Sequence, residues 1–202
     1  LYYYAFFAKI PKSTKVITIV SVSVFLFFSI FYVKEVKDRF LIEYETAFVD
    51  NTTKCILIEN ENQNMSIGQA WYNDKFQQNS FFPGTALRVY QARIFFELLK
   101  EQHVFFQGFG VEASQEYIKQ KTKKYNLYHE YGVLNFHNQY LQTFAELGFF
   151  GFLTLCLILF QNVKEAIINK NFLHIAFAFT TLMLFLTESF FCRQRGIVFF
   201  VT

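Results

Sequence analysis

Three long apolar runs restrict this chain to a small set of folds. Val16–Val33 contains eighteen residues without a charge, and Leu147–Val163 and Asn171–Thr187 contain seventeen each. At a helical rise of about 1.5 Å per residue, such runs are about 26 Å long, close to the hydrocarbon thickness of a bilayer. Because lipid tolerates no exposed irregular backbone, the sequence predicts an all-α, polytopic transmembrane protein.

The apolar runs also suggest how the chain is organised. We expect transmembrane helices at residues 15–33, 137–163 and 171–190. Residues 1–8 are typical of the tail of a preceding span, and residues 196–202 of the start of a truncated terminal span, since both are apolar and too short to cross a membrane. This pattern predicts the C-terminal portion of a larger multi-pass protein.

The composition supports a membrane protein and argues against several other classes. The chain of 202 residues has thirty Phe and twelve Tyr but only 17% charged residues, which does not fit an ordinary soluble domain. A net charge of +3 does not indicate a protein that binds nucleic acid. The three cysteines have no metal or redox spacing, so we expect neither a metal nor a cofactor.

The lysines predict the orientation. They flank the start of the first span and fill the short link between the other two: Lys9, Lys12, Lys15, Lys164 and Lys170. The positive-inside rule puts these ends in the cytoplasm. Residues 34–136 would then form one large outer loop region, which is too long to lack structure of its own.

Within the outer region, Pro83-Gly84 is a turn signal and Thr85 is a candidate N-cap for an amphipathic helix at 86–103. We expect residues 40–50 to be extended or irregular, and residues 112–124 to form a polar helix. The lysines of that helix form either a solvated face or a contact with anionic headgroups: Lys119, Lys121, Lys123 and Lys124.

Arg88 is the first candidate for chemistry. It lies near the start of the predicted amphipathic helix, and no carboxylate stands three or four residues away to neutralise it. An arginine of this kind, near free helical N–H groups, is suited to holding an anion. An ordinary solvated arginine is the alternative interpretation. Arg93 differs, because Glu97 at i+4 is positioned to pair with it.

The second candidate group lies where the outer region meets the membrane. Asn138, Gln142 and Glu146 are spaced by four and predict one polar stripe on the helix, with His137 at its mouth. Polar groups at such a position must face protein or a wet cavity. The imidazole of His137 is a candidate general base, because histidine can accept a proton near neutral pH, although an interfacial histidine is the alternative interpretation. Gly148 and Gly151 would allow close approach of another helix.

A third group follows the last long run. Glu188 and Arg193 lie at its outer end, where a structural ion pair is the simplest interpretation and anion binding is the other. A transporter or other non-catalytic membrane protein is the alternative function, with the polar stripe lining a permeation path. The sequence shows no inverted repeat of the kind that transporters use.

Three segments, taken in order, resemble the O-antigen ligase and O-antigen polymerase superfamily. They are the arginine-led helix that ends in a Gly-rich turn, the His-Asn segment, and the closing Thr-Glu-Ser segment that leads to Arg-x-x-Gly: 86–110, 136–151 and 186–196. The resemblance covers about residues 86 to 200. It implies a multi-pass protein of the bacterial inner membrane whose active side is periplasmic.

The resemblance also implies a reaction and its residues. An undecaprenyl-diphosphate-linked glycan would be the donor, and a hydroxyl of a growing glycan or of lipid A-core the acceptor. His137 and Arg88 would be catalytic, without a metal. The implied substrate-binding residues are Arg93, Asn138, Gln142, Glu146, Glu188 and Arg193. Ligase, polymerase and protein-glycosylating relatives are not separated, and we expect this portion alone to be inactive.

Overall fold

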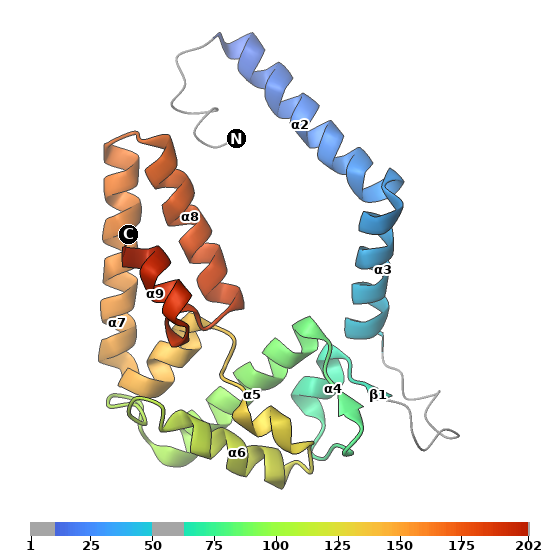
Figure 1. The fold of residues 1–202 in the computed structure, drawn as a ribbon, viewed down its shortest axis with the longest axis vertical. Coiled ribbons are helices and arrows are strands. Elements are labelled where there is room, and N and C mark those ends of the chain that lie inside the picture. Colours follow the sequence, from blue (N-terminus) through green and yellow to red (C-terminus); the bar gives the residue numbers. More distant parts are fainter. Residues whose placement is uncertain (1–10, 50–62, 202) are drawn as a thin grey trace.

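The computed structural model describes residues 11–49 and 63–201 and is mostly helical (Figure 1). The predicted spans at 1–8 and at the very end of the chain therefore fall wholly or partly outside the described residues. In chain order the elements are α2 (Lys12–Tyr32), α3 (Lys34–Ala47), β1 (Gln63–Asn64), α4 (Ile67–Tyr72), β2 (Ser80–Phe81), α5 (Gly84–Gln102), α6 (Ser114–Lys124), η1 (His129–Val133), α7 (Gln139–Ile168), α8 (Phe172–Thr187), η2 (Phe190–Cys192) and α9 (Gln194–Val201).

Two of the described helices are long and apolar enough to cross a membrane. These are α2, over Lys12–Ser29, and α7, over its whole length of 30 residues. The third predicted span corresponds to α8, which is apolar but has only 16 residues and ends at Thr187 rather than at residue 190. The last three residues of that predicted span instead form an extended corner and the start of η2.

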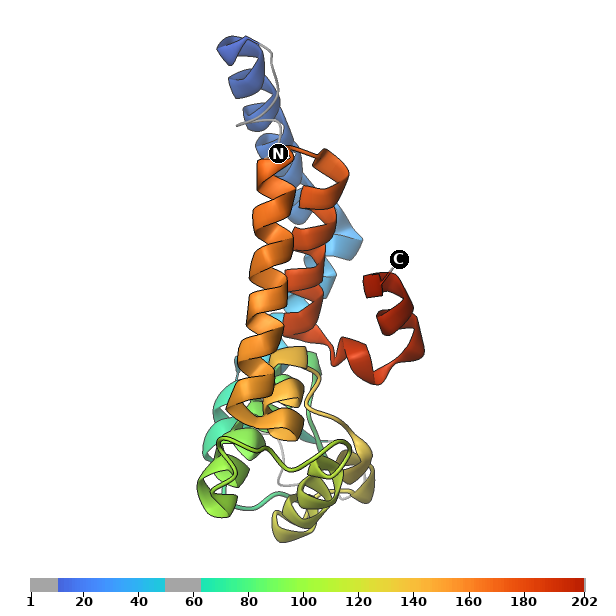
Figure 2. The same ribbon diagram turned by 90° about the vertical axis from the view of Figure 1, so that its left-hand side faces the viewer.

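The start of α2 and the end of α7 lie at the same end of the molecule, so these two candidate membrane helices run in opposite directions (Figure 1). In both views the start of α2 and the link between α7 and α8 lie toward one end of the molecule, and residues 63–136 lie at the other (Figures 1 and 2). We call residues 63–136 the middle region. The lysines at the start of α2 and in the α7–α8 link therefore share one end, opposite the middle region.

Helix α7 is bent at Gly148, where the backbone is not helical (φ 68°, ψ −165°). The part that follows the bend, 149–168, is about 30 Å long and fits the membrane. The part before it carries Asn138, Gln142 and Glu146 and packs on the middle region, because Ala145 belongs to its core. The predicted polar stripe therefore lies on the part of α7 before the bend and does not continue along the apolar part that follows it.

The bend at Gly148 is held by the loop that follows α5. Backbone hydrogen bonds run from Phe109 N to Ala145 O (2.7 Å), from Gly110 N to Glu146 O (3.0 Å) and from Phe149 N to Phe105 O (2.8 Å). The loop and the helix come so close that a Cβ on Gly108 would lie 2.5 Å from Glu146 O. The predicted close approach at Gly148 is thus real, but the partner is a loop rather than a helix.

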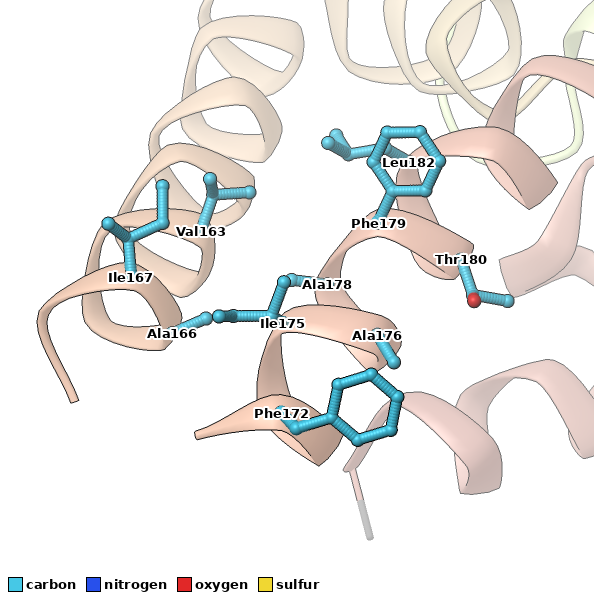
Figure 3. Close-up of a pocket in the computed structure, with 10 residues that line it drawn as sticks. All are labelled: Val163, Ala166, Ile167, Phe172, Ile175, Ala176, Ala178, Phe179, Thr180 and Leu182. Carbon is cyan, nitrogen blue, oxygen red and sulfur yellow. The ribbon is translucent and has the colours of Figure 1, made fainter. Parts of the chain in front are cut away.

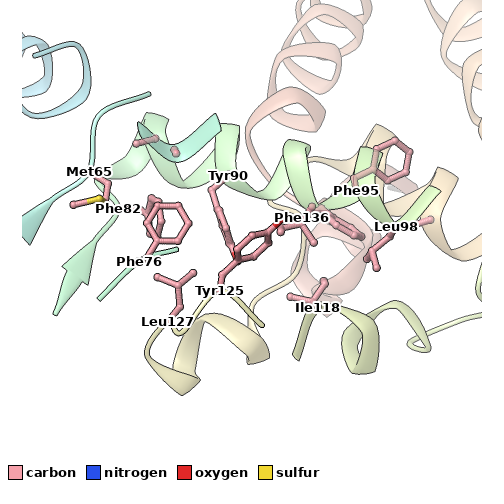
Figure 4. Packing of buried hydrophobic residues seen from close by; sticks show 14 residues of the cluster. Met65, Phe76, Phe82, Tyr90, Phe95, Leu98, Ile118, Tyr125, Leu127 and Phe136 are labelled. Carbon is pink, nitrogen blue, oxygen red and sulfur yellow. The ribbon is translucent and has the colours of Figure 1, made fainter. Parts of the chain in front are cut away.

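The middle region has an aromatic core of its own (Figure 4). Tyr90, on α5, is its centre: the ring stacks on Phe82 at 4.8 Å and meets Phe76 edge-on at 5.9 Å. Burial raises the pKa of Tyr90 far above its ordinary value. The apolar face that the periodicity of α5 predicts is therefore buried in this core.

An ion network joins α5 to α6. Glu97 accepts hydrogen bonds from Arg93 (2.8 Å), Lys121 (2.7 Å) and the Tyr125 hydroxyl (2.6 Å). Burial opposes ionisation of Glu97, but these hydrogen bonds outweigh it and hold its pKa below the ordinary value. Lys121 also contacts Glu101 and is buried, so the expected solvated lysine face is wrong at this position.

Two further local expectations are wrong. Residues 34–47 form helix α3 instead of an extended segment from 40 onward, because the segment lacks Gly and Pro and is rich in helix formers. Helix α5 begins at Gly84 after Pro83, so Thr85 is not its N-cap. The Thr85 hydroxyl instead donates to Glu43 Oε1 at 2.6 Å, which joins α5 to α3.

Helices α7 and α8 form an antiparallel pair packed around Leu155, Leu159 and Phe185. A cavity of about 690 Å³ opens between them near their link (Figure 3). Its described walls are apolar apart from Thr180. Helix α9 lies to one side of the pair in Figure 2, and Phe200 reaches the same cluster.

Candidate functional site

The short segment Leu186–Ser189, which runs from the last two residues of α8 to the residue before η2, is where three distant parts of the chain meet. Glu188 is extended there (φ −145°, ψ 148°), which ends α8 and turns its side chain away from the helix axis. Side chains of α5, of the entry to α7 and of the turn before α9 contact this segment. We call it the Leu186–Ser189 corner and describe its contacts in turn.

Arg88 reaches the corner from the first turn of α5. Its Nε donates to Thr187 O at 3.2 Å, and its Nη1 donates to Gly84 O at 3.1 Å. Within residues 11–49 and 63–201 no carboxylate forms an ion pair with it. Because a guanidinium has five N–H donors, these two bonds fix its position and leave donors for a ligand. These two bonds therefore hold the positive charge of Arg88 in place beside the corner.

His137 occupies a strained backbone position beside the corner. Its φ is 45°, in the left-handed region that a non-glycine residue rarely adopts. The Asn135 side chain stabilises this turn by accepting a hydrogen bond from His137 N at 3.0 Å. Strain of this kind is typical of residues whose side chain is held for function.

Asn138 joins the entry of α7 to the corner. Its side-chain oxygen caps the helix by accepting from Leu141 N (3.1 Å), while its Nδ2 donates to Leu186 O (3.1 Å). Its backbone N–H donates to the hydroxyl of Ser189 at 3.3 Å, and Ser189 is completely buried. Asn138 therefore fixes His137 relative to the corner.

Glu188 is the centre of the charged group. Its Oε2 lies 3.5 Å from His137 Nδ1 and 3.2 Å from Arg193 Nη2. The side chains of His137 and Glu188 are 20% and 31% exposed, and that of Arg193 is 62% exposed. The arrangement places a carboxylate between an imidazole and a guanidinium, open to solvent on the arginine side.

The other candidates lie beside this group or away from it. Gln142 is buried, accepts from Phe136 N at 3.2 Å and donates to Glu146 Oε1 at 2.6 Å, so it supports the turn that carries His137. Arg93 belongs to the Glu97 network and donates to Asn73 O at 2.6 Å. Arg88, His137, Asn138, Glu188 and Arg193 thus share one corner, and Arg93 does not join them.

Sequence reasoning missed three residues that build the corner: Asn135, Ser189 and Gln139. Gln139 Oε1 accepts from Phe191 N at 2.6 Å and so ties η2 to α7. The available signal was weak. Asn135 precedes the His-Asn pair, and Ser189 follows Glu188 directly, but a polar residue beside a candidate is too common to be singled out.

Among the residues that the structure describes, no three His, Cys, Asp or Glu side chains gather as a metal site requires. One cavity lies between α7 and α8 and another lies in the middle region. The described linings of these two cavities do not include Arg88, His137 or Glu188.

Comparison with protein families decides the class. The family model of the O-antigen ligase matches residues 1–156, which is more than half of the chain. The chain belongs to the O-antigen ligase family. Neither the curated proteins nor the solved structures contain a significant match.

The residues that the family model matches include one part of the candidate site in this O-antigen ligase family member and leave out another. It includes Arg88, His137 and Asn138, and it begins well before residue 86, where the sequence resemblance was expected to start. It ends at residue 156, before Glu188 and Arg193. The family supports glycosyl transfer in O-antigen assembly in general, while the inclusion of Glu188 and Arg193 rests on their contacts with His137 and with each other.

Proposed function

We propose that this family member transfers a glycan from an undecaprenyl-diphosphate carrier to a sugar hydroxyl, and that the Leu186–Ser189 corner is its active site. The observation that supports this most is the convergence of Arg88, His137 and Glu188. Arg88 and Thr187 are 99 positions apart in the sequence, yet they are hydrogen-bonded. A base, a carboxylate and a non-neutralised arginine in one place suit the transfer of a group away from a diphosphate.

In this mechanism His137 is the general base. A neutral imidazole that directs its Nδ1–H toward Glu188 has Nε2 free to accept a proton. The 3.5 Å separation is longer than an ordinary hydrogen bond, and such contacts often shorten when substrate binds. Nε2 takes the proton of the acceptor hydroxyl as its oxygen attacks the anomeric carbon. Glu188 then stabilises the imidazolium that forms, so it is a positioning residue.

Arg88 acts on the other side of the reaction. As the new C–O bond forms, the bond from the anomeric carbon to the diphosphate oxygen breaks, and its electron pair leaves on the diphosphate. The fixed guanidinium of Arg88 faces this growing negative charge without reorganising. Arg193 is exposed enough to add a second positive charge at the rim. Attack opposite the leaving group inverts the anomeric centre.

The orientation follows from the same proposal. With the lysine-bearing ends of α2 and of the α7–α8 pair in the cytoplasm, the middle region and the corner lie on the periplasmic side of the bacterial inner membrane. The carrier lipid would then extend into the bilayer beside α7, and its diphosphate would meet Arg88 at the surface. The acceptor is a growing glycan or lipid A-core.

The test is transfer of a lipid-diphosphate-linked glycan in membranes that contain the complete gene product. We expect His137→Ala to lower the transfer rate by about 10²–10⁴-fold, the usual contribution of a general base. His174→Ala is the matched control, because His174 lies in the first turn of α8, at the opposite end of that helix from the corner. Near wild-type transfer by His137→Ala would remove the base assignment, and loss of activity with chelators would remove the metal-free mechanism.

A further inference from the structure

A second cavity lies in the middle region, between β2, the start of α5 and η1. Its volume is about 720 Å³, within the range of small-ligand sites. Two aromatic side chains on its lining are partly exposed, Phe81 at 46% and Tyr128 at 42%. None of the described residues that line it is a lysine or an arginine. An anion such as a diphosphate would therefore find no counter-charge there.

The polar groups of this cavity are fixed and still have bonding capacity. The Tyr131 hydroxyl accepts a hydrogen bond from Phe82 N at 3.1 Å, which leaves its own proton to donate. Burial raises the pKa of Tyr131, so that proton is retained. Gln78 Nε2 donates to Asn126 at 3.1 Å, which fixes the amide and leaves Oε1 as an acceptor. Glu130 adds an exposed carboxylate that forms no ion pair with any described residue.

This combination matches the chemistry of a sugar. The C–H groups on the face of a pyranose carry partial positive charge and pack on the electron-rich face of an aromatic ring. Its hydroxyls each donate and accept, so they pair with amide oxygens, carboxylates and a tyrosine hydroxyl. The lining of this cavity is largely apolar, and Gln78, Ser80 and Glu130 add polar groups to it, a combination that suits a sugar ring with its apolar face and polar rim.

Two chain segments lead from the lining of the cavity to Arg88 and His137. Leu87 lines the cavity and directly precedes Arg88 on the first turn of α5. Leu134 lines it as well and stands three residues before His137. Because three residues span at most about 11 Å, the part of the cavity that Leu134 lines is within that distance of the His137 backbone.

We propose that this cavity is the acceptor subsite, which binds a sugar ring of the acceptor glycan between Phe81 and Tyr128 and presents its hydroxyl to His137. The assignment to the acceptor rests on the proposed function, since the base must face the attacking hydroxyl. The donor diphosphate belongs at Arg88, because the cavity lining offers no cation.

Binding without turnover tests the subsite. The complete gene product is placed in lipid nanodiscs, and saturation-transfer NMR measures its binding of two delipidated probes, lipopolysaccharide core oligosaccharide and an O-antigen repeat oligosaccharide. We expect one of them to bind, and its Kd to rise by about tenfold in Phe81→Ala/Tyr128→Ala, since two aromatic contacts are lost. Tyr128→Phe keeps the ring and should bind nearly as wild type. Tyr72→Ala, an exposed tyrosine outside the cavity, should leave Kd unchanged.

The outcomes separate this proposal from the proposed function. If neither probe binds, or if the Phe81→Ala/Tyr128→Ala variant binds as tightly as wild type, the subsite is wrong. If binding depends on these rings while His137→Ala still transfers glycan, the subsite stands and the base assignment fails. The three binding variants change exposed side chains, those of Phe81, Tyr128 and Tyr72, so the aromatic core around Tyr90 stays intact.

Discussion

Replacing Gly148 by Ala should loosen the join between α7 and the middle region. Gly148 has φ 68° and ψ −165°, a region that is essentially confined to glycine and costs a residue with a Cβ about 1–3 kcal/mol. The new Cβ would also lie 2.6 Å from Gly108 N and overlap Phe106 O. We expect two of the backbone hydrogen bonds that hold the loop to be lost, each worth about 0.5–1.5 kcal/mol. The sum is about 2–6 kcal/mol.

Gly110→Ala is the matched control within the same loop. Gly110 also has a positive φ (+96°), but its Cβ would meet only the Cβ of Ala113, at 3.9 Å. This variant therefore has a backbone strain of about 1–3 kcal/mol without the overlap. The difference between the two variants isolates the close approach at the bend of α7.

Hydrogen–deuterium exchange of the backbone amides of Phe109, Gly110 and Phe149 measures this difference locally. Each of these amides donates across the join. Since about 1.4 kcal/mol is a factor of ten, Gly148→Ala should speed their exchange by about 5- to 150-fold more than Gly110→Ala does. Equal exchange in the two variants would refute the reasoning, because strain alone would then explain both.

Three further predictions concern single side chains. Glu97→Gln should destabilise the protein by about 1–3 kcal/mol at pH 7, because it breaks a partly buried charge network. Since folding lowers the pKa of Glu97, the wild type should lose its stability advantage over the variant as the pH falls below about 4.5. The difference in thermal unfolding temperature between the two proteins should therefore be smaller at pH 3 than at pH 7. Burial, followed by the charges of Glu146 and Glu112, raises the pKa of Cys192 to about 11, so maleimide labelling of this thiol at pH 8, mapped by mass spectrometry, should be roughly 10- to 100-fold slower than that of a free peptide thiol. Arg88→Lys should impair glycan transfer in the membrane assay although it keeps the charge, since an ammonium lacks the planar fork that holds a diphosphate; wild-type rates would contradict this.

The sequence predicts the regular elements well because their signals are local. A charge-free run of membrane length identifies α2 and α7, and apolar residues at helical spacing identify α5 within two residues at its start. The polar candidates Arg88 and His137 stand out because each is unusual in its own neighbourhood. No long-range contact is needed for these predictions.

The remainder depends on contacts between residues that are far apart in the chain. The bend at Gly148 exists because the Phe105–Gly110 loop bonds to it, and the buried state of Lys121 depends on Glu97 and Glu101 of another helix. Arg93 resembles Arg88 as a helix-borne arginine, yet Tyr125 and Asn73 draw it into a different cluster. The residue pattern around each of these positions does not predict these distant partners.

The central claim is that His137 and Glu188 act together on the acceptor hydroxyl, and a double-mutant cycle on the rate of glycan transfer tests it most directly. Glu188→Gln alone should slow transfer by about tenfold or more, because it removes the charge that orients and stabilises the imidazole. In a His137→Ala background the same change should slow transfer by less than about twofold, since residues that act as a unit are not additive. The account would be contradicted if the double variant lost as much transfer rate as the product of the two single losses, or if Glu188→Gln transferred glycan at the wild-type rate.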